Sequence, residues 1–207
     1  MVPSLPPISG PRSIFGPAIK DRLRKAALAR RKAFVQAMSD GARAQLEQQL
    51  ARHLTAILAG ARVVGGYAPM GSEISPLLAM EEARAVGAIV AFPAFDHPAK
   101  PFRFRAGDPA EPGPFGIMQP GRKAALVDPD LILVPLVAID PQGTRLGRGK
   151  GHYDAALARL RKGGARLVGI GWPNQLIEEE IPADEWDIAL DGFVSPDEVR
   201  WFRTESR

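Results

Sequence analysis

Residues 131–154 read LILVPLVAIDPQGTRLGRGKGHYD, and this stretch decides the fold class. The run Leu131–Ile139 carries no charged or hydroxyl side chain, which predicts a strand buried on both faces. A glycine-rich turn follows, and a helix is predicted from His152 to about Arg161. The apolar segment Arg166–Gly171 predicts the next strand. A strand, a turn, a helix and a second strand in this order are typical of a parallel βαβ unit.

The segments before this unit extend the same alternation. Strong helix formers predict helices over residues 18–38 and 42–58, with Ser39-Asp40 as the N-cap of the second and Gly60 at its end. Short apolar runs predict strands at 62–67 and 88–92, on either side of a helix that begins at Ser75-Pro76. We therefore expect an α/β fold, a single-domain Rossmann-like three-layer sandwich with a mostly parallel sheet and an N-terminal helical pair.

Two segments lack a helical pattern. Residues 1–15 are rich in proline and glycine and are predicted to be a disordered arm, which leaves residues 16–207 as a single domain. Residues 93–120 are rich in Pro, Gly and Phe, and a long irregular loop of this kind is often functional. Within it, the alternation over Phe102–Arg105 predicts an edge strand.

Composition narrows the classes of function. The 207 residues are 45% apolar and 24% charged, as in an ordinary globular domain. Zero cysteines exclude disulfides, cysteine-ligated metals and thiol nucleophiles. The net charge of +4 suits anionic ligands, but it is spread along the chain, so we expect no nucleic-acid partner. No stretch reaches the about 20 apolar residues of a membrane span, and no signal-peptide layout is seen, so we expect a cytoplasmic protein.

The glycine-rich turn carries the chemistry. It follows the carboxyl end of a predicted strand, where α/β sheets bind ligands, and it leads into a helix N-terminus that offers free N–H groups. Arg145, Arg148 and Lys150 add positive charge for phosphate oxygens, and Asp154 could hold Mg²⁺. The spacing matches neither a Walker A loop nor Gly-x-Gly-x-x-Gly. As a bare pattern it could also be only a tight turn, but the three cations favour an anion site.

The stretch LVPLVAIDPQGTRLGRGKGHYDAAL, residues 133–157, closely resembles the signature of the 5-formyltetrahydrofolate cyclo-ligase family. The resemblance continues from about Lys20 to Val194. Further matching segments are Lys20-x-x-x-Arg24, GYAPMGSEI at 66–74, Phe92-Pro93, Phe102–Phe104, GIMQP at 116–120, and Gln175, Pro182, Asp187 and Asp191. Two positions depart from the family: Gln119 stands where an acidic residue is common, near the expected folate pocket, and His152 where another aromatic residue is usual.

The resemblance implies an enzyme, a ligase of folate metabolism that uses ATP and Mg²⁺. It would cyclise 5-formyltetrahydrofolate to 5,10-methenyltetrahydrofolate, giving ADP and phosphate, through a phosphorylated formyl (iminium phosphate) intermediate. The implied partners are small molecules only, ATP and the folate with or without a polyglutamate tail. We expect a monomer, with no nucleic acid and no membrane bound.

The family's functional residues fall on matching positions of this chain. Arg145, Arg148, Lys150 and Tyr153 would be catalytic, with Tyr153 positioning the formyl group. ATP would contact Lys20, Arg24, Arg145, Leu146, Gly147, Arg148, Gly149, Lys150, Gly151, His152 and Tyr153. The folate would contact Ala68, Met70, Glu73 and Tyr153, and Asp154 and Asp187 would be the metal ligands.

Simpler interpretations stand beside these. Lys20, Arg24 and Arg31 share one helical face and could be a solvated stripe; the resemblance covers only the first two, so Arg31 is expected at the surface. Glu73 and Asp154 each precede or open a helix and could merely favour its dipole. Rival functions are a cyclo-ligase-like protein that binds nucleotide or folate as a regulator, a basic nucleic-acid-binding module, and a dinucleotide-dependent dehydrogenase.

Overall fold

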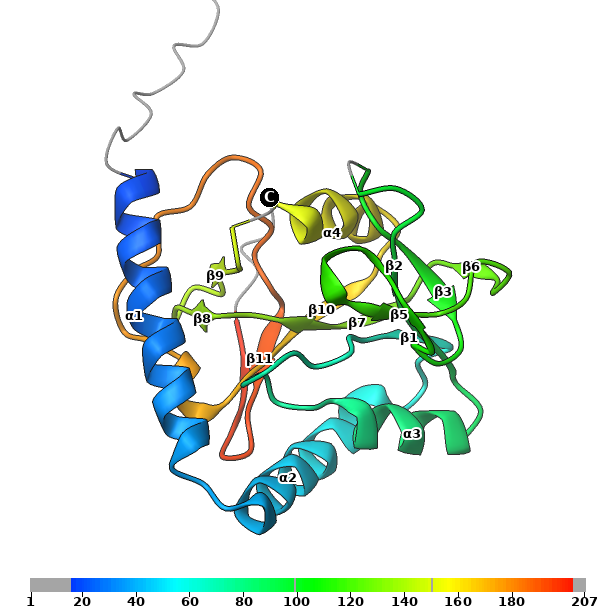
Figure 1. Cartoon of the computed structure of the whole chain (residues 1–207), viewed down its shortest axis with the longest axis horizontal. Helices are drawn as coiled ribbons and strands as arrows, with labels where there is room; N and C mark the ends of the chain where they lie inside the picture. Colours follow the sequence, from blue (N-terminus) through cyan, green and yellow to red (C-terminus); the bar gives the residue numbers. More distant parts are fainter. Residues whose placement is uncertain (1–15, 99, 150, 203–207) are drawn as a thin grey trace, which may run out of the picture.

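The computed structural model describes residues 16–98, 100–149 and 151–202, and its centre is an eight-stranded sheet (Figure 1). The strand order is β12-β11-β10-β7-β1-β2-β3-β6. The five strands from β11 to β2 run parallel, and β12, β3 and β6 are antiparallel to their neighbours. Their bounds are β1 Val63–Gly65, β2 Ile89–Ala94, β3 Arg103–Ala106, β6 Leu126–Val127, β7 Leu131–Pro135, β10 Arg166–Ile170, β11 Gly192–Val194 and β12 Val199–Trp201.

Helices cover both faces of this sheet. α2 (Asp40–Leu58) and α3 (Leu77–Ala85) pack on one face, where Leu131 and Leu133 of β7 point. α4 (His152–Lys162) packs on the other, with Ile132 and Val134. Because successive side chains of β7 enter opposite cores, this strand is buried on both faces, as predicted. The predicted three-layer α/β fold is confirmed.

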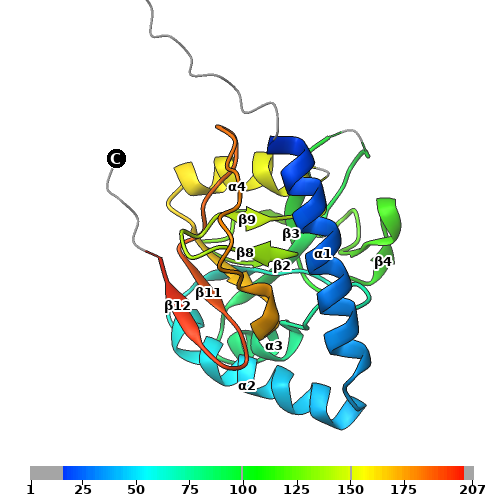
Figure 2. The same cartoon turned by 90° about the vertical axis from the view of Figure 1, so that its left-hand side faces the viewer.

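The first helix, α1 (Gly16–Gln36), belongs to neither layer. It stands across the end of the sheet, beside the small hairpin of β8 (Ala138–Ile139) and β9 (Arg145–Leu146), as Figure 2 shows. Leu23 and Ala27 of α1 are buried there against the hairpin. The predicted helical pair is thus present, and Ser39 caps α2 by accepting a hydrogen bond from the Ala42 N–H.

The strand order places a cleft between β1 and β7. From β1 the chain crosses through α3 to β2 on one side, and from β7 it crosses through α4 to β10 on the other. The connections leave the carboxyl ends of β1 and β7 in opposite directions, and this divergence opens the space in which α/β folds bind ligands.

Two predicted strands differ from the structure. The run Leu131–Ile139 is not one strand, because β7 ends at Pro135, the register of its pairing with β10 also ends there, and the chain turns before β8. The carbonyls of Leu136 and Val137 at this break accept hydrogen bonds from the buried Gln175 amide. The predicted edge strand at 102–105 is present as β3, but β6 pairs with its outer side and forms the edge.

The long loop has no α-helix in its described part, as predicted. It contains the short hairpin of β4 (Glu111–Pro112) and β5 (Met118–Gln119) and a single 3₁₀ turn, η1, at Pro114–Gly116. The predicted arm at 1–15 and the last five residues of the predicted domain lie outside the described residues. None of the helices in the described ranges is long and apolar enough to cross a membrane.

Candidate functional site

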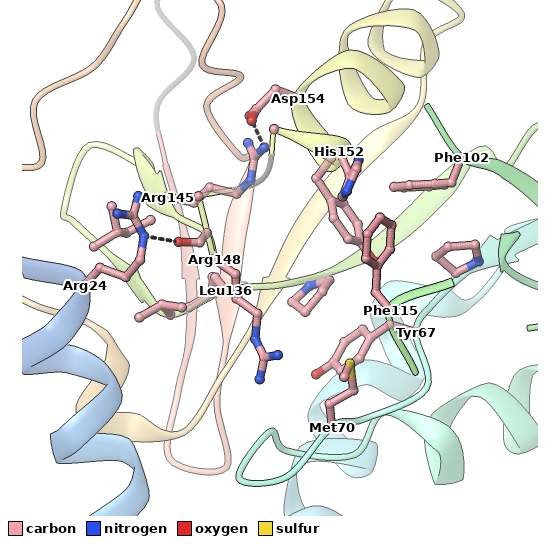
Figure 3. A pocket seen from close by; sticks show the side chains of 18 of the residues that line it. Arg24, Tyr67, Met70, Phe102, Phe115, Leu136, Arg145, Arg148, His152 and Asp154 are labelled. Carbon is pink, nitrogen blue, oxygen red and sulfur yellow. Dashed lines mark hydrogen bonds and ion pairs between the residues drawn. The ribbon is translucent and has the colours of Figure 1, made fainter. Parts of the chain in front are cut away.

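A cavity of about 410 Å³ opens at the carboxyl ends of β1 and β7. Every predicted site residue that the structure describes lines it, drawn from α1, the loop after β1, the segment from β9 to α4, and the segment before β11 (Figure 3). These are Lys20, Arg24, Ala68, Met70, Glu73, Arg145, Leu146, Gly147, Arg148, Gly149, Gly151, His152, Tyr153, Asp154 and Asp187. Lys150 lies outside the described residues. The structure thus gathers the predicted residues in one place, and their binding roles stay predictions.

The glycine loop is docked against the first helix. Arg24 Nε donates to the Gly147 carbonyl at 2.8 Å. Gly149 has φ +83°, a left-handed conformation, and a Cβ there would lie 3.2 Å from the Arg24 guanidinium carbon. A side chain at position 149 would therefore be strained and would crowd Arg24. Gly151, with φ 65°, is the N-cap of α4, and it has no side chain to accept from the first N–H groups of the helix, which can therefore donate to a ligand.

Those cations of the site that the structure describes are paired with carboxylates of the chain. Arg145 donates to the carboxylate of Asp154 and, at 2.6 Å, to the Ile188 carbonyl. Lys20 Nζ lies 2.6 Å from the carboxylates of both Asp184 and Asp187. Partial burial lowers the pKa of Lys20, but these hydrogen bonds outweigh it, and the net pKa is raised. The ammonium is therefore held charged.

Glu73 is held on a braced loop. Its Oε2 accepts from the Met70 N–H at 2.9 Å, and its Oε1 lies 3.5 Å from Arg148 Nε. The backbone carbonyls of residues 72–74 accept hydrogen bonds from the side chains of Trp172, Arg43 and Tyr67, at 2.9, 2.9 and 2.7 Å. With so many fixed contacts, the carboxylate is preorganised at the cavity wall, a tighter arrangement than a helix-dipole role requires.

The prediction that Arg31 lies at the surface is wrong. Its exposed fraction is 1%, and its guanidinium donates to Ser72 Oγ at 3.1 Å and to the Leu136 carbonyl at 3.2 Å. Burial lowers the pKa of Arg31. The physical reason is the spacing of Leu23, Ala27 and Arg31, four residues apart, which puts all three on the face of α1 that packs inward. Arg31 fixes the wall of the cavity from behind.

Aromatic rings form a second wall of the cavity, apart from the wall that carries Glu73. Phe95 lies 5.7 Å from Phe102, 5.7 Å from Phe115 and 5.2 Å from His152, between ring centroids, and Tyr153 lies 4.9 Å from Phe102. Burial raises the pKa of Tyr153, which keeps its phenol protonated and able to donate. Sequence reasoning missed Phe95 and Phe115; the only signal was the phenylalanine content of the long loop. Phe115 holds a left-handed φ of 64°, a strained conformation for a residue with a side chain.

The two departures from the family pattern have different settings. Gln119, expected near the folate pocket, does not line the cavity; its Oε1 accepts from the Phe95 N–H at 3.0 Å and so supports the aromatic wall from outside. His152 lies within the wall, with its ring against Phe95 and Phe115. A planar ring is thus kept at position 152.

Asp140 ties the glycine-loop hairpin to the closing segment. It is fully buried, and its Oδ1 accepts from the N–H groups of Gln142 and Thr144 at 3.0 and 2.8 Å. Its Oδ2 accepts from the N–H of Ile181 at 3.0 Å. The carboxylate therefore connects the turn before Arg145 with the segment that leads to Asp184 and Asp187.

The described residues offer few protein ligands for a metal ion. In the described ranges, no three His, Cys, Asp or Glu residues group as a metal site. Asp154 and Asp187 both line the cavity, but Oδ1 of Asp154 is bonded to Arg145 and Oδ2 of Asp187 to Lys20. Each keeps a second carboxylate oxygen, so the pair fits Mg²⁺ only with phosphate oxygens as further ligands.

Comparisons with known proteins agree on one family. The model of the 5-formyltetrahydrofolate cyclo-ligase family matches residues 17–196. The chain is 29% identical to the 5-formyltetrahydrofolate cyclo-ligase of Mycolicibacterium smegmatis over 88% of this chain and 96% of that protein. It is 41% identical to the Escherichia coli K12 enzyme of the same name over a shorter stretch, 34% of this chain and 38% of that protein.

Solved structures give the same result. The NMR structure of Aquifex aeolicus 5,10-methenyltetrahydrofolate synthetase is similar, with a TM-score of 0.75 and 29% identity over 91% of this chain and 95% of that one. The synthetase from Mycoplasma pneumoniae, at a TM-score of 0.68 and 23% identity over 86% of this chain and 98% of that one, shares the fold.

Proposed function

Because the chain belongs to the 5-formyltetrahydrofolate cyclo-ligase family, we propose that it converts 5-formyltetrahydrofolate and ATP to 5,10-methenyltetrahydrofolate, ADP and phosphate. One observation carries the proposal: a single cavity is lined by the glycine loop with its cations, by the braced Glu73, and by a wall of aromatic rings. A transfer between two substrates needs both in one enclosure, in contact with each other.

The nucleotide phosphates would lie on the glycine loop. Their oxygens would meet the open N-terminus of α4 and the side chains of Arg145 and Arg148, with Arg24 holding the loop from the other side. Lys150, which the sequence puts in the same loop, would add a further cation. These groups stabilise negative charge most where it builds up during phosphoryl transfer.

The folate would lie across the loop after β1. The carboxylate of Glu73 can accept two parallel hydrogen bonds from the amino-pyrimidine edge of the pterin. Ala68 and Met70 line the same part of the cavity, and the rings of Phe102 and Phe115 offer faces or edges to a planar ligand. The neutral phenol of Tyr153 can donate to the formyl oxygen and hold it toward the phosphates.

The proposed chemistry makes a poor electrophile reactive. The formyl oxygen attacks the γ-phosphoryl group, ADP leaves, and the formyl carbon becomes an iminium phosphate on nitrogen 5. Nitrogen 10 then attacks this carbon and loses its proton, and the carbon–oxygen bond breaks to release phosphate. Positioning and charge stabilisation supply the catalysis, so a chain without cysteine can carry it out.

Mg²⁺ is part of the proposal, with Asp154 and Asp187 as its protein ligands. When bound, the ion would neutralise phosphate charge and orient the nucleotide. For each carboxylate to contribute, its free oxygen would turn toward the phosphates while the other stays on Arg145 or Lys20.

The test is formation of 5,10-methenyltetrahydrofolate, followed by its near-ultraviolet absorbance in a single turnover. We expect product only when ATP is present, with one ADP released per product. Binding of both ligands without product would favour the regulator, and salt-dependent binding of an oligonucleotide would favour the nucleic-acid module. Size-exclusion chromatography with light scattering tests the proposed monomer.

A further inference from the structure

An exposed tryptophan stands at the nucleotide end of the cavity. Trp186 is 60% exposed and lines the same cavity as Lys20 and Arg24. An indole ring buries a large apolar area when it is covered, so leaving it open to water forgoes that gain. A ring that lines a cavity, as this one does, is placed where a ligand can cover it.

The turn that presents this ring is fixed at both ends. The Asp187 N–H donates to the Asp184 carbonyl at 3.0 Å, and the Asp184 N–H donates to the Asp187 carboxylate at 2.9 Å. Lys20 Nζ then binds both carboxylates at 2.6 Å. Trp186 lies inside this turn, so its backbone is held against α1 before any ligand arrives, and little entropy is lost when a ligand stacks on it.

The other two tryptophans of the chain lie in different surroundings. Trp172 is fully buried and packs on Phe34, with ring centroids 5.8 Å apart. Trp201 is 46% exposed, but it lies on β12 under Arg166, whose guanidinium carbon is 5.0 Å from the ring centroid. Of the three, Trp186 alone lines the cavity.

We propose that Trp186 is the platform on which the nucleobase of the nucleotide stacks, an inference that rests on the proposed function. The occupant is a planar base and not the folate, because the neighbours of Trp186 in its turn bind Lys20, which lies one helical turn before Arg24 on α1. The Glu73 carboxylate comes from the loop after β1, and the phenylalanine wall comes from the long loop after β2, where Figure 3 shows Phe102 and Phe115 away from Arg24. Lys20 then acts on the base indirectly, by fixing the turn.

Tripolyphosphate provides the matching probe, since it carries the charges of ATP without the base. Stacking of a base on an aromatic side chain is worth about 1–3 kcal/mol, which is about 5- to 150-fold in affinity. Trp186→Ala should therefore weaken ATP binding by this factor, measured by calorimetry, and leave tripolyphosphate binding unchanged. Trp186→Phe should retain most of the ATP affinity, because the ring is kept. Trp201→Ala is the control for an exposed tryptophan outside the cavity and should change neither.

The outcomes separate this proposal from the proposed function. Equal weakening of ATP and tripolyphosphate, no weakening of ATP, or a loss confined to 5-formyltetrahydrofolate would each overturn the nucleobase platform. If the wild-type protein turns over with ATP while Trp186→Ala behaves as wild type, only the platform fails. If the wild-type protein neither binds ATP nor forms product, the proposed function fails. Thermal melting of Trp186→Ala should match the wild type, because the side chain is mostly exposed.

Discussion

Asp140→Asn changes one oxygen of a fully buried carboxylate into a donor and tests how the proposed nucleotide site is assembled. The carboxylate accepts three backbone N–H groups at 2.8 to 3.0 Å. An amide oxygen can keep the two donors of the turn, those of Gln142 and Thr144, but its NH₂ then faces the N–H of Ile181. One charge-assisted hydrogen bond is lost and a buried donor is left unpaired, which together cost about 2–3 kcal/mol.

Urea unfolding measures this cost. With an m-value of about 2 kcal/mol per molar urea, the midpoint should fall by about 1–1.5 M with the slope unchanged. Asp108→Asn is the control, because the Asp108 side chain forms an exposed ion pair with Arg84, and its effect should stay within about 0.5 kcal/mol. If Asp140→Asn lowers the free energy of unfolding no more than Asp108→Asn does, the three hydrogen bonds of Asp140 do not stabilise the fold as argued.

The same variant should act on the site. Ile181 leads to the turn that carries Asp184 and Asp187, and Thr144 precedes Arg145, so both sides of the nucleotide end are loosened. We expect KM for ATP to rise more than KM for the folate. A rise confined to the folate would mean that Asp140 does not organise the nucleotide end.

Three further predictions concern groups in or behind the cavity wall. Arg31→Ala should destabilise the fold by about 2–4 kcal/mol in urea unfolding, since it leaves a cavity and an unpaired Ser72 hydroxyl, whereas Arg22→Ala on the exposed side of α1 should cost under about 0.5 kcal/mol; similar losses would contradict the burial of Arg31. Glu73→Gln should weaken folate binding and spare ATP binding in calorimetry, because an amide puts a donor against the donors of the pterin; equal losses would argue against the pterin role. Burial raises the pKa of both tyrosines, Tyr67 and Tyr153, above the ordinary value of about 10, so their stabilising effect is full below pH 10 and is lost as the pH rises beyond it; tyrosinate absorbance should appear only as the protein unfolds, and a rise near pH 10 in the native state would count against this.

Features that depend on neighbouring residues could be predicted from the sequence pattern. The Ser39 cap of α2 could be predicted because it involves only neighbouring residues: the Ser39 side chain accepts from the Ala42 N–H. The glycine loop was predicted at a strand's carboxyl end, and the rule that parallel strands bind ligands there also brings the loop after β1 to the same cavity. The individual site residues came from the resemblance to the family. Lys20 and Asp187, for example, lie far apart along the chain, and no local sequence pattern predicts that they are close in space.

Features set by distant contacts were not predictable in this way. Arg31 was misassigned because a charged residue on a helix is usually solvated, and its partners Ser72 and Leu136 come from two other segments. Phe115 reaches the cavity through a left-handed turn in a loop that has no periodicity. The end of β7 at Pro135 depends on where its partner β10 stops, which the apolar run itself does not encode.

The ion pairs between Lys20 and the carboxylates of Asp184 and Asp187 also determine how late in synthesis α1 can make its final contacts. Lys20 is separated from Asp184 by 164 residues and from Asp187 by 167 residues, nearly the full length of the described chain. At a translation rate of about 5–20 residues per second, a ribosome needs roughly 8–33 s to make the stretch between them. During that interval α1 lacks the residues that complete its contacts, and the proposed nucleotide site is incomplete. α1 is therefore synthesised well before the residues that fix it, and it reaches its final place late.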